Sequence, residues 1–246
     1  MNDNRFNRLE ILFGQKGVNR LANASIAVFG LGGVGSFAVE ALIRSGVGRL
    51  TLIDFDTIDI TNMNRQLHAT DDTVGRPKVQ VMSERCLSIN PNAKIEPILD
   101  FFTVDNSSEL LDRGYDYVLD CIDHVTAKLT LIEESRKKSI PIIASMGAAN
   151  KTDPTQIRVA DLAETYGCRL ARIVRRELRK RGIETGLKVV YSTEGFVPLA
   201  SGRRETDEDG HYQERRAPLG SSSVIPPIFG LTMAGEVIRD LTNGEG

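Results

Sequence analysis

Cysteine is scarce in this sequence, and its spacing offers no paired motif. The 246-residue chain contains three cysteines, Cys86, Cys121 and Cys168, and no CxxC pair. Three widely spaced cysteines provide neither a four-cysteine zinc site nor a disulfide framework. This usage fits a reducing compartment, so we expect a cytoplasmic protein.

Long apolar runs and a strong net charge are also absent. The N-terminal stretch MNDNRFNRLE lacks the apolar segment of a secretory signal, and no run of about 18 apolar residues predicts a membrane span. A net charge of -2 argues against wholesale coating of nucleic acid. With 41% hydrophobic and 26% charged residues, the chain suits one large α/β domain or a domain with an appended lobe.

The clearest motif is a strand, a glycine-rich turn and a helix. Ile26–Phe29 predicts a buried strand, and Ser36–Ser45 predicts the helix that follows. Between and beside them lie Gly30, Gly32, Gly33 and Gly35. A second strand, Leu50–Ile53, ends in Asp54, whose carboxylate is placed to meet a ribose. Backbone N–H groups at such a turn and helix N-terminus hold a phosphate, so we expect a nucleotide site.

The remaining pattern predicts a doubly wound, mostly parallel sheet of Rossmann type with an appended C-terminal region. We expect helices at 5–24, 79–89, 127–138, 168–181 and 229–241, and further strands at 93–98, 117–121, 141–145 and 157–160. Residues 202–216 have no apolar periodicity and predict a mobile surface loop. We therefore treat 1–246 as a single domain.

The stretch after Asp54 distinguishes between nucleotides. A dinucleotide redox enzyme needs little beyond the ribose acid here, whereas this chain presents Asn62, Arg65 and Gln66, and then Lys78. If the chain folds back so that Arg65 and Lys78 lie at the glycine turn, the two cations suit a triphosphate. Its leaving pyrophosphate needs its charge neutralised. Taken singly, such cations are usually solvated surface groups. In this order they predict ATP.

Acidic residues offer two further assignments. Asp120 and Asp123 follow a predicted strand, and either can supply a hard oxygen ligand for Mg²⁺. Asp56 competes with Asp54 as the ribose ligand, and we favour Asp54 because it directly follows the apolar strand.

At this point a resemblance becomes specific. The runs GLGGVGS, LIDFDTIDITNMNRQ, GRPK and DCID are similar to the ubiquitin-activating-like (ThiF/MoeB-type) adenylating superfamily. The resemblance implies that Asp54 binds the ATP ribose, that Arg65 and Lys78 bind phosphates, and that Asp123 holds Mg²⁺. It also implies that Arg8 reaches the phosphates of a partner subunit, hence a homodimer. A surface pair between Arg8 and an acid such as Glu10 is the competing interpretation.

Within that superfamily, the second half of the chain resembles the tRNA threonylcarbamoyladenosine dehydratases. The runs KTDPTQIRVADLAET, CRLARIVRRELRKRGI and VVYSTE carry this resemblance, whereas the sulfur-carrier adenylyltransferases use a CxxC pair that is missing here. Some dehydratases carry a cysteine where this chain has GSSSVIPPIFG. Cys168 is the remaining candidate for a reactive thiol, and a structural or helix-capping role is the favoured alternative.

A basic helix fits a tRNA substrate. Residues 168–182 contain seven basic side chains and one acid, and one stripe of this helix is formed by Arg169, Arg172, Arg176 and Arg179. A basic stripe on an otherwise acidic body is typical of a surface that binds a phosphate backbone. An ordinary solvated helix face is the alternative.

The resemblance implies ATP-dependent cyclisation of threonylcarbamoyl-adenosine in tRNA, through an acyl-adenylate and with release of AMP and pyrophosphate. The first alternative is adenylation of the C-terminal carboxylate of a ubiquitin-like sulfur-carrier protein. The second is a nucleotide-binding scaffold or redox sensor without chemistry. A sulfur-transfer or redox partner protein is compatible with the resemblance, and the residues do not identify one.

Overall fold

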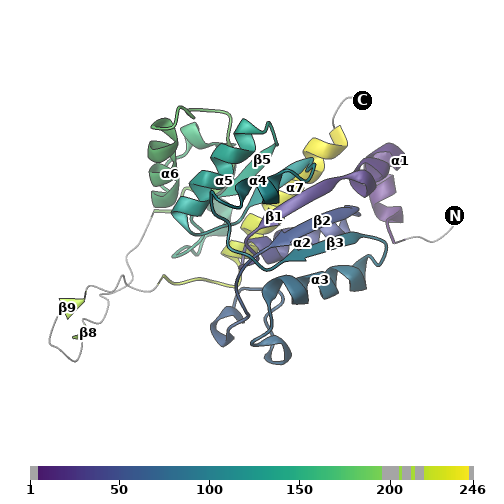
Figure 1. Cartoon of the computed structure of the whole chain (residues 1–246), viewed down its shortest axis with the longest axis horizontal. Coiled ribbons are helices and arrows are strands. Elements are labelled where there is room, and N and C mark those ends of the chain that lie inside the picture. Colours follow the sequence, from purple (N-terminus) through teal and green to yellow (C-terminus); the bar gives the residue numbers. More distant parts are fainter. Residues whose placement is uncertain (1–4, 196–204, 207–211, 214–218, 244–246) are drawn as a thin grey trace.

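The strand–helix alternation builds one mixed sheet, shown in Figure 1. The computed structural model describes residues 5–195, 205–206, 212–213 and 219–243. In the sheet the strands run in the order β3-β2-β1-β4-β5-β7-β6. Their bounds are β1 Ser25–Phe29, β2 Arg49–Ile53, β3 Lys94–Ile98, β4 Tyr117–Asp120, β5 Ile142–Ser145, β6 Ile157–Asp161 and β7 Lys188–Ser192.

All neighbouring strands are parallel except β6, which pairs antiparallel with β7. The chain winds outward from β1 to β3 and then crosses to β4 on the other side of β1. This reversal beside β1 creates a crevice at the carboxyl ends of the strands, where ligands of doubly wound folds bind. The predicted Rossmann-type fold class is confirmed.

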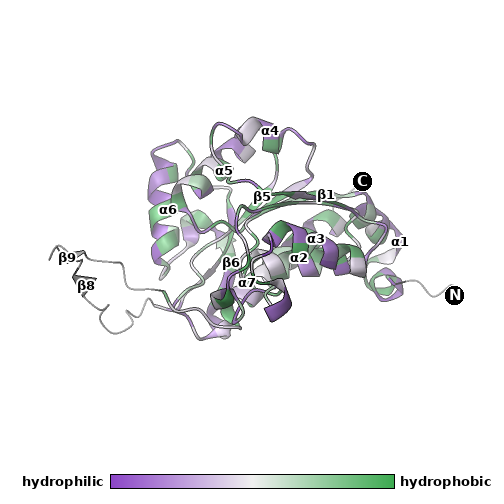
Figure 2. Cartoon of the chain, turned by 60° about the horizontal axis from the view of Figure 1, so that its bottom comes forward, coloured by the Kyte–Doolittle hydropathy of each residue, from purple (hydrophilic) through white to green (hydrophobic). Residues whose placement is uncertain are grey.

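Helices cover both faces of the sheet, as Figure 2 shows. Their bounds are α1 Asn7–Asn23, α2 Gly35–Arg44, α3 Lys78–Ile89, α4 Ser107–Leu111, α5 Val125–Lys137, α6 Arg169–Arg179 and α7 Ile225–Asn243. One core joins α2, α3 and α7 to alternate strand residues such as Val28, and a second core joins α4, α5 and α6 to the intervening ones, such as Phe29. The central strands β1, β4 and β5 are buried almost throughout, as expected for strands covered on both faces.

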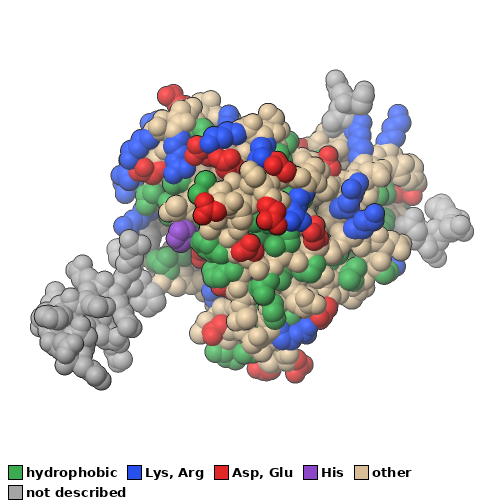
Figure 3. All heavy atoms as spheres, viewed as in Figure 1, with side chains coloured by type: hydrophobic (Ala, Val, Ile, Leu, Met, Phe, Trp, Pro, Cys, Tyr) green, Lys and Arg blue, Asp and Glu red, His purple; other side chains and the backbone are tan. Residues whose placement is uncertain are grey.

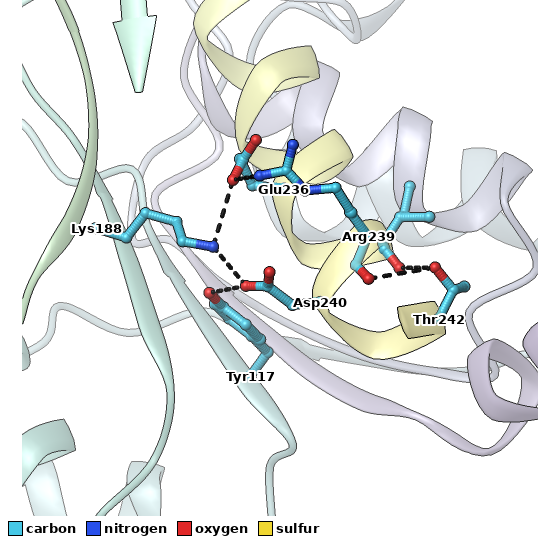
Figure 4. Close-up of polar contacts among 7 residues, drawn as sticks. Tyr117, Lys188, Glu236, Arg239, Asp240 and Thr242 are labelled. Atoms are coloured by element: carbon cyan, nitrogen blue, oxygen red, sulfur yellow. Dashed lines mark hydrogen bonds and ion pairs between the residues drawn. The ribbon is translucent and has the colours of Figure 1, made fainter. Parts of the chain in front are cut away.

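Helix α7 is fixed to the rest of the fold at both of its ends. Near its start a Cβ at Gly230 would lie 2.1 Å from the Val34 carbonyl oxygen, so only glycine allows this approach to α2. Farther along, Asp240 accepts from Tyr117 at 3.0 Å and pairs with Lys188 at 2.7 Å (Figure 4). The C-terminal helix is therefore part of the same domain as the glycine turn.

Three details differ from the expectations. The last helix begins at Ile225, before the predicted Phe229, because prolines are compatible with a first helical turn. Helix α4 and strand β7 were not predicted; α4 is too short to show a helical period, and β7 lies between polar loops. The predicted mobile loop 202–216 falls largely outside the described residues, which there comprise strands β8 (Glu205–Thr206) and β9 (Tyr212–Gln213).

Candidate functional site

A cleft of about 340 Å³ opens at the carboxyl ends of β1, β2 and β4. Its walls come from the glycine turn, the segment after β2, the loop after β3, the loop after β4 and the start of α7. Predicted site residues lining it are Gly30, Gly32, Gly33, Asp54, Asn62, Arg65, Gln66, Lys78 and Asp123. The structure thus brings together most of the groups that the sequence analysis assigned to ATP, whereas Gly35 does not line the cleft.

The four glycines of the turn have different roles. Gly30 has a positive φ of 88°, and a Cβ there would lie 2.8 Å from the Cys121 carbonyl oxygen. A Cβ at Gly35 would meet the Gly30 carbonyl oxygen at 1.8 Å, and one at Gly33 would meet Pro226 at 3.0 Å. At Gly32 the nearest atom, the Gln66 amide nitrogen, is 4.0 Å away. Gly30, Gly33 and Gly35 allow close packing, and Gly32 leaves the cleft open for a ligand to approach the backbone.

Asp54 links the second strand to the glycine turn. Its Oδ2 accepts from the Leu31 backbone N–H at 2.6 Å, and its Oδ1 accepts from the Asp56 backbone N–H at 2.8 Å. Burial raises the pKa of this carboxyl, and the positive charge of Lys78 opposes the rise. Asp54 is therefore a fixed, buried acceptor at the edge of the cleft.

Lys78 is a buried cation in the cleft wall. It is the first residue of α3 and only 5% exposed, and its Nζ lies 2.6 Å from Asp56 Oδ2. A buried ammonium requires a partner, and the half-exposed Asp56 supplies it. The two acids that the sequence offered as ribose ligands therefore have different contacts. Asp56 pairs with Lys78, whereas Asp54 accepts from the backbone of the glycine turn.

The segment between β2 and α3 carries three predicted ligands. Asn62 accepts from the Asp59 backbone N–H at 3.2 Å, which fixes a short 3-10 turn. The guanidinium of Arg65 donates to the Thr61 carbonyl oxygen at 2.8 Å and lines the cleft. Gln66 is buried, and its Oε1 has no hydrogen-bond partner among the described residues. An orphaned buried acceptor beside an open turn points to a ligand that donates to it.

The two candidate magnesium ligands at the end of β4 have different surroundings. Asp120 is fully buried and pairs with the fully buried Lys128 at 2.8 Å, so its carboxylate faces the core. This corrects the expectation that either acid is available to a metal. Asp123 is exposed and lines the cleft. No cluster of three or more His, Cys, Asp or Glu is present in the described part of the chain.

Arg8 does not reach the cleft of its own chain. It is exposed on the first turn of α1 and is not among the residues that line the cleft. Its neighbour Arg5 donates to the Ile89 carbonyl oxygen at the end of α3, and Phe6 lies near Gly46 after α2. These helix ends lie at the amino ends of the strands, on the side of the sheet opposite the cleft. A role for Arg8 at a nucleotide therefore requires a second subunit.

Cys168 caps a helix. Its Sγ accepts from the Ala171 backbone N–H at 3.5 Å, and the residue is only 6% exposed. The structure thus shows the capping geometry that was favoured over a reactive thiol. Cys121 lines the cleft, but burial raises the pKa of its thiol, as it does for Cys86, where it reaches about 12. Thiols with raised pKa values are poor nucleophiles at neutral pH.

The basic stripe is on the surface, as predicted. The residues Arg169, Arg172, Arg176 and Arg179 are all exposed along α6, and Figure 3 shows Lys and Arg side chains gathered over this helix. Arg175 instead turns inward and donates to the Thr165 carbonyl and hydroxyl oxygens. Arg176 pairs with Glu177 at 2.9 Å, while Arg172 and Arg179 have no ion-pair partner in the part of the chain that the structure describes.

The sequence analysis missed two parts of the cleft. Phe55 and Phe101 line it beside the predicted ligands, and Ser221 closes it from the loop before α7. Asn64 donates to the Ser221 carbonyl oxygen at 2.9 Å, which joins this loop to the segment after β2. The aromatics had a detectable signal, since each follows a predicted strand, but the contact with Ser221 spans 157 residues and leaves no local pattern.

Comparisons with known proteins agree with this geometry. The ThiF family model matches residues 6–245. The tRNA threonylcarbamoyladenosine dehydratase of Bacillus subtilis is 43% identical over 239 residues, covering 96% of this chain and 94% of that protein. The crystal structure of the Escherichia coli tRNA N6-threonylcarbamoyladenosine dehydratase with AMP superposes with a TM-score of 0.86 at 38% identity, covering 96% and 93%.

A further relative matches two thirds of the chain. The molybdopterin-synthase adenylyltransferase of Salmonella typhimurium is 37% identical over 166 residues, which is 67% of this chain and 65% of that protein.

No helix among the described residues has the length and apolar character needed to cross a membrane.

Proposed function

Since the chain belongs to the ThiF family, we propose that it is an ATP-dependent tRNA threonylcarbamoyladenosine dehydratase. Relatives of that name match it over nearly their whole length. The single observation that carries the proposal is the cleft, in which an open glycine turn faces the buried cation of Lys78 and the guanidinium of Arg65. This arrangement suits a triphosphate that loses pyrophosphate.

ATP binds with its ribose toward Asp54 and its phosphates toward the glycine turn. Gly32 leaves the backbone accessible, and the N-terminus of α2 favours the negative charge. Lys78 and Arg65 neutralise the β- and γ-phosphates, and the orphaned Oε1 of Gln66 accepts from a nucleotide donor. Asn62 fixes the turn that presents these groups.

The reaction then needs two displacements. The threonyl carboxylate of threonylcarbamoyl-adenosine attacks the α-phosphorus of ATP, pyrophosphate leaves, and a mixed anhydride with AMP forms. An atom of the neighbouring urea closes on the acyl carbon and expels AMP, so one water is lost overall. Because closure is intramolecular, positioning and exclusion of water supply much of the rate. The proposed reaction uses no protein nucleophile, and the burial of Cys168 supports this.

Magnesium fits Asp123. The carboxylate is exposed in the cleft wall, while Asp120 is committed to Lys128. One protein carboxylate with substrate phosphates and water is the usual way in which proteins hold Mg²⁺. When bound, the ion would neutralise charge that develops on the phosphate oxygens.

A second subunit completes the site in this proposal. Arg8 is exposed at the sheet edge opposite the cleft, so it serves a nucleotide only across a homodimer interface. Mixing an Arg8→Ala variant with a Lys78→Ala variant tests this arrangement. A homodimer that shares its sites regains partial activity in the mixture, whereas a protein that acts as a monomer regains none.

The tRNA lies over α6, where Arg172 and Arg179 project without an ion-pair partner among the described residues. The competing activity, adenylation of a ubiquitin-like sulfur carrier, has weaker support. The adenylyltransferase relative matches 67% of this chain, and no CxxC pair is present in the sequence.

One assay separates the two activities. The protein is incubated with Mg²⁺, ATP and tRNA bearing threonylcarbamoyl-adenosine, and the nucleoside mass and AMP are measured after mild work-up. The proposal predicts loss of one water together with AMP. If the nucleoside mass is unchanged and AMP appears only with a diglycine-tailed carrier protein, the proposal is wrong.

A further inference from the structure

Tyr166 is an exposed aromatic residue in the segment that connects β6 to α6. It is 66% exposed, more than any other Phe or Tyr whose burial is described. Its ring meets that of the buried Tyr191 with centroids 6.1 Å apart and planes at 75°. Tyr166 is not among the residues that line the cleft, so it lies outside the proposed ATP site.

The backbone on both sides of Tyr166 is fixed. Thr165 is buried, and its carbonyl oxygen accepts from the guanidinium of Arg175 at 2.8 Å. Gly167 has a positive φ of 73°, and a Cβ there would lie 2.6 Å from the Thr193 carbonyl oxygen, so only glycine allows this close approach. A side chain that is held outward by a fixed backbone loses little conformational freedom when a ligand binds it.

Tyr166 lies at the same end of the sheet as the cleft. Thr193, which Gly167 contacts, follows the carboxyl end of β7, and β5 separates β7 from β4. With a strand spacing of about 4.8 Å, β4 and β7 are about 10 Å apart. A Cβ at Gly147, just after β5, would lie 3.6 Å from the Sγ of Cys168, and the next residue, Ala148, lines the cleft. The segment that carries Tyr166 therefore adjoins the cleft without entering it.

Cations come from both elements that flank Tyr166 in the chain. On β6, Arg158 lies opposite Tyr191 in the antiparallel ladder with β7, so these two side chains share a face of the sheet. Arg158 is exposed, as are Arg169 and Arg172 at the start of α6. Tyr166, whose ring contacts that of Tyr191, therefore lies among cations of the edge strand and of the basic helix.

The charge of this surface favours a nucleic acid over a protein partner. Glu164 is exposed in the turn before Tyr166, but exposed cations outnumber it on β6 and α6. An aromatic ring flanked by Arg side chains matches the way in which proteins hold unpaired bases, which stack on the ring while the cations meet the backbone. A protein partner would need acidic groups to match the arginines, and its binding is one outcome of the test.

We propose that Tyr166 stacks an unpaired base of the tRNA near the modified adenosine. The inference rests on the proposed function, which requires the substrate adenosine to reach the cleft. A nucleotide that enters an enzyme site leaves its stack, and its neighbours then gain from a new stacking partner. The strand that leads out of the cleft passes the end of β5 toward α6, where Tyr166 supplies the ring and Arg169 and Arg172 supply the charge.

The sequence offers a clean optical probe for this contact, because it contains no tryptophan. Tyr166→Trp keeps an aromatic ring at the exposed position and makes the fluorescence of the protein report on it. Leu87→Trp is the matched control, since Leu87 is 41% exposed on α3, which packs over β2 and β3 rather than beside α6.

The two probe variants are titrated at low salt with an unmodified RNA hairpin that has an unpaired loop. Fully paired RNA of equal length carries the same backbone charge without free bases and serves as comparison. We expect the hairpin to quench the tryptophan at position 166 in step with binding, and the paired RNA to leave it unchanged. The control tryptophan should respond to neither RNA. A hairpin that does not bind, or that binds without quenching position 166, would overturn the inference.

Steady-state kinetics measure what the ring contributes to catalysis. Tyr166→Leu should raise KM for the modified tRNA about tenfold, in line with the loss of one base–aromatic stack, and leave the Kd for AMP within about twofold. Tyr166→Phe keeps the ring and should stay close to wild type, as should Leu87→Ala. An unchanged KM in Tyr166→Leu would contradict the stack. An equal rise of KM in Tyr166→Phe would assign the effect to the hydroxyl and contradict it as well.

These outcomes keep the inference separate from the proposed function. If the hairpin quenches the tryptophan at position 166 but the wild-type protein does not dehydrate the modified tRNA, the proposed function fails and the base contact stands. If dehydration occurs without any quenching, the function stands and the base contact fails. A tryptophan that responds to a diglycine-tailed carrier protein and not to RNA would assign this surface to a protein partner and overturn the inference.

Discussion

The Nζ of Lys78 lies 2.6 Å from Asp56 Oδ2, inside the wall of the cleft. Lys78 is 5% exposed as a residue, whereas the Asp56 side chain is 44% exposed, so the cation is held from the solvent side by its partner. A charge placed in this way is available to a phosphate that enters the cleft, and it need not be desolvated at that moment.

Removing this cation should abolish turnover without unfolding the protein. We expect Lys78→Ala to lower the rate of AMP release by about 100-fold or more, the usual effect of losing one group that stabilises transition-state charge. Steady-state kinetics and thermal unfolding measure the two effects. Lys94→Ala, an exposed lysine at the amino end of β3, is the control and should behave as wild type. Full activity in Lys78→Ala would remove the residue from the ATP site.

The pair of Asp120 and Lys128 should be a stability determinant. Both side chains are fully buried, and their atoms are 2.8 Å apart. Lys128→Met leaves a carboxylate without its partner and should reduce the free energy of unfolding by about 3–5 kcal/mol. The double variant with Asp120→Asn should recover much of that loss. Lys137→Met, on the exposed side of the same helix, should cost less than about 1 kcal/mol in urea unfolding. Equal losses at both lysines would contradict the buried pair.

His68 should make stability fall on acidification. The ring is 3% exposed, and neither nitrogen has a hydrogen-bond partner among the described residues. Burial, followed by the charge of Lys78, lowers its pKa from 6.5 to about 4. Between these values the unfolded chain binds the extra proton, so the free energy of unfolding decreases as pH falls, by about 3 kcal/mol in total.

Urea unfolding at a series of pH values measures this slope. His68→Leu should flatten the decrease between pH 6.5 and 4, because the buried titrating group is gone. His124→Asn, which removes an exposed histidine, should keep it. A slope that is unchanged in His68→Leu would show that other groups cause the acid sensitivity.

The stripe on α6 should bind tRNA through charge. Arg172→Glu and Arg179→Glu are each expected to weaken tRNA binding and to lower the slope of log K against log salt by about 1, with ATP binding unchanged. Filter binding across a salt series measures this slope. Lys94→Glu makes the same change of charge at the amino end of β3, far from the cleft end of the strands, and should leave the salt slope unchanged. An equal effect at Lys94 would indicate non-specific attraction only.

Local patterns were enough to predict much of this molecule. The glycine turn and strands β1 and β2 have strong local signals, and the alternation of strands with helices predicted a doubly wound, mostly parallel sheet. Contacts between distant segments were out of reach. The partner of Asp120 is eight residues away on a helix face with no distinctive pattern, so the sequence left this acid as a candidate metal ligand beside Asp123. The pairing of Asp56 with Lys78 likewise depends on how the loop after β2 folds back.

Formation of an acyl-adenylate is the central step of the proposed reaction, and isotope transfer tests it most directly. The threonyl carboxylate of the tRNA substrate is labelled with ¹⁸O, and the products are analysed by mass spectrometry after one round of reaction with ATP. Attack on the α-phosphorus predicts one ¹⁸O in AMP and none in pyrophosphate. Label in inorganic phosphate, with ADP as the other product, would show attack on the γ-phosphorus and contradict the account.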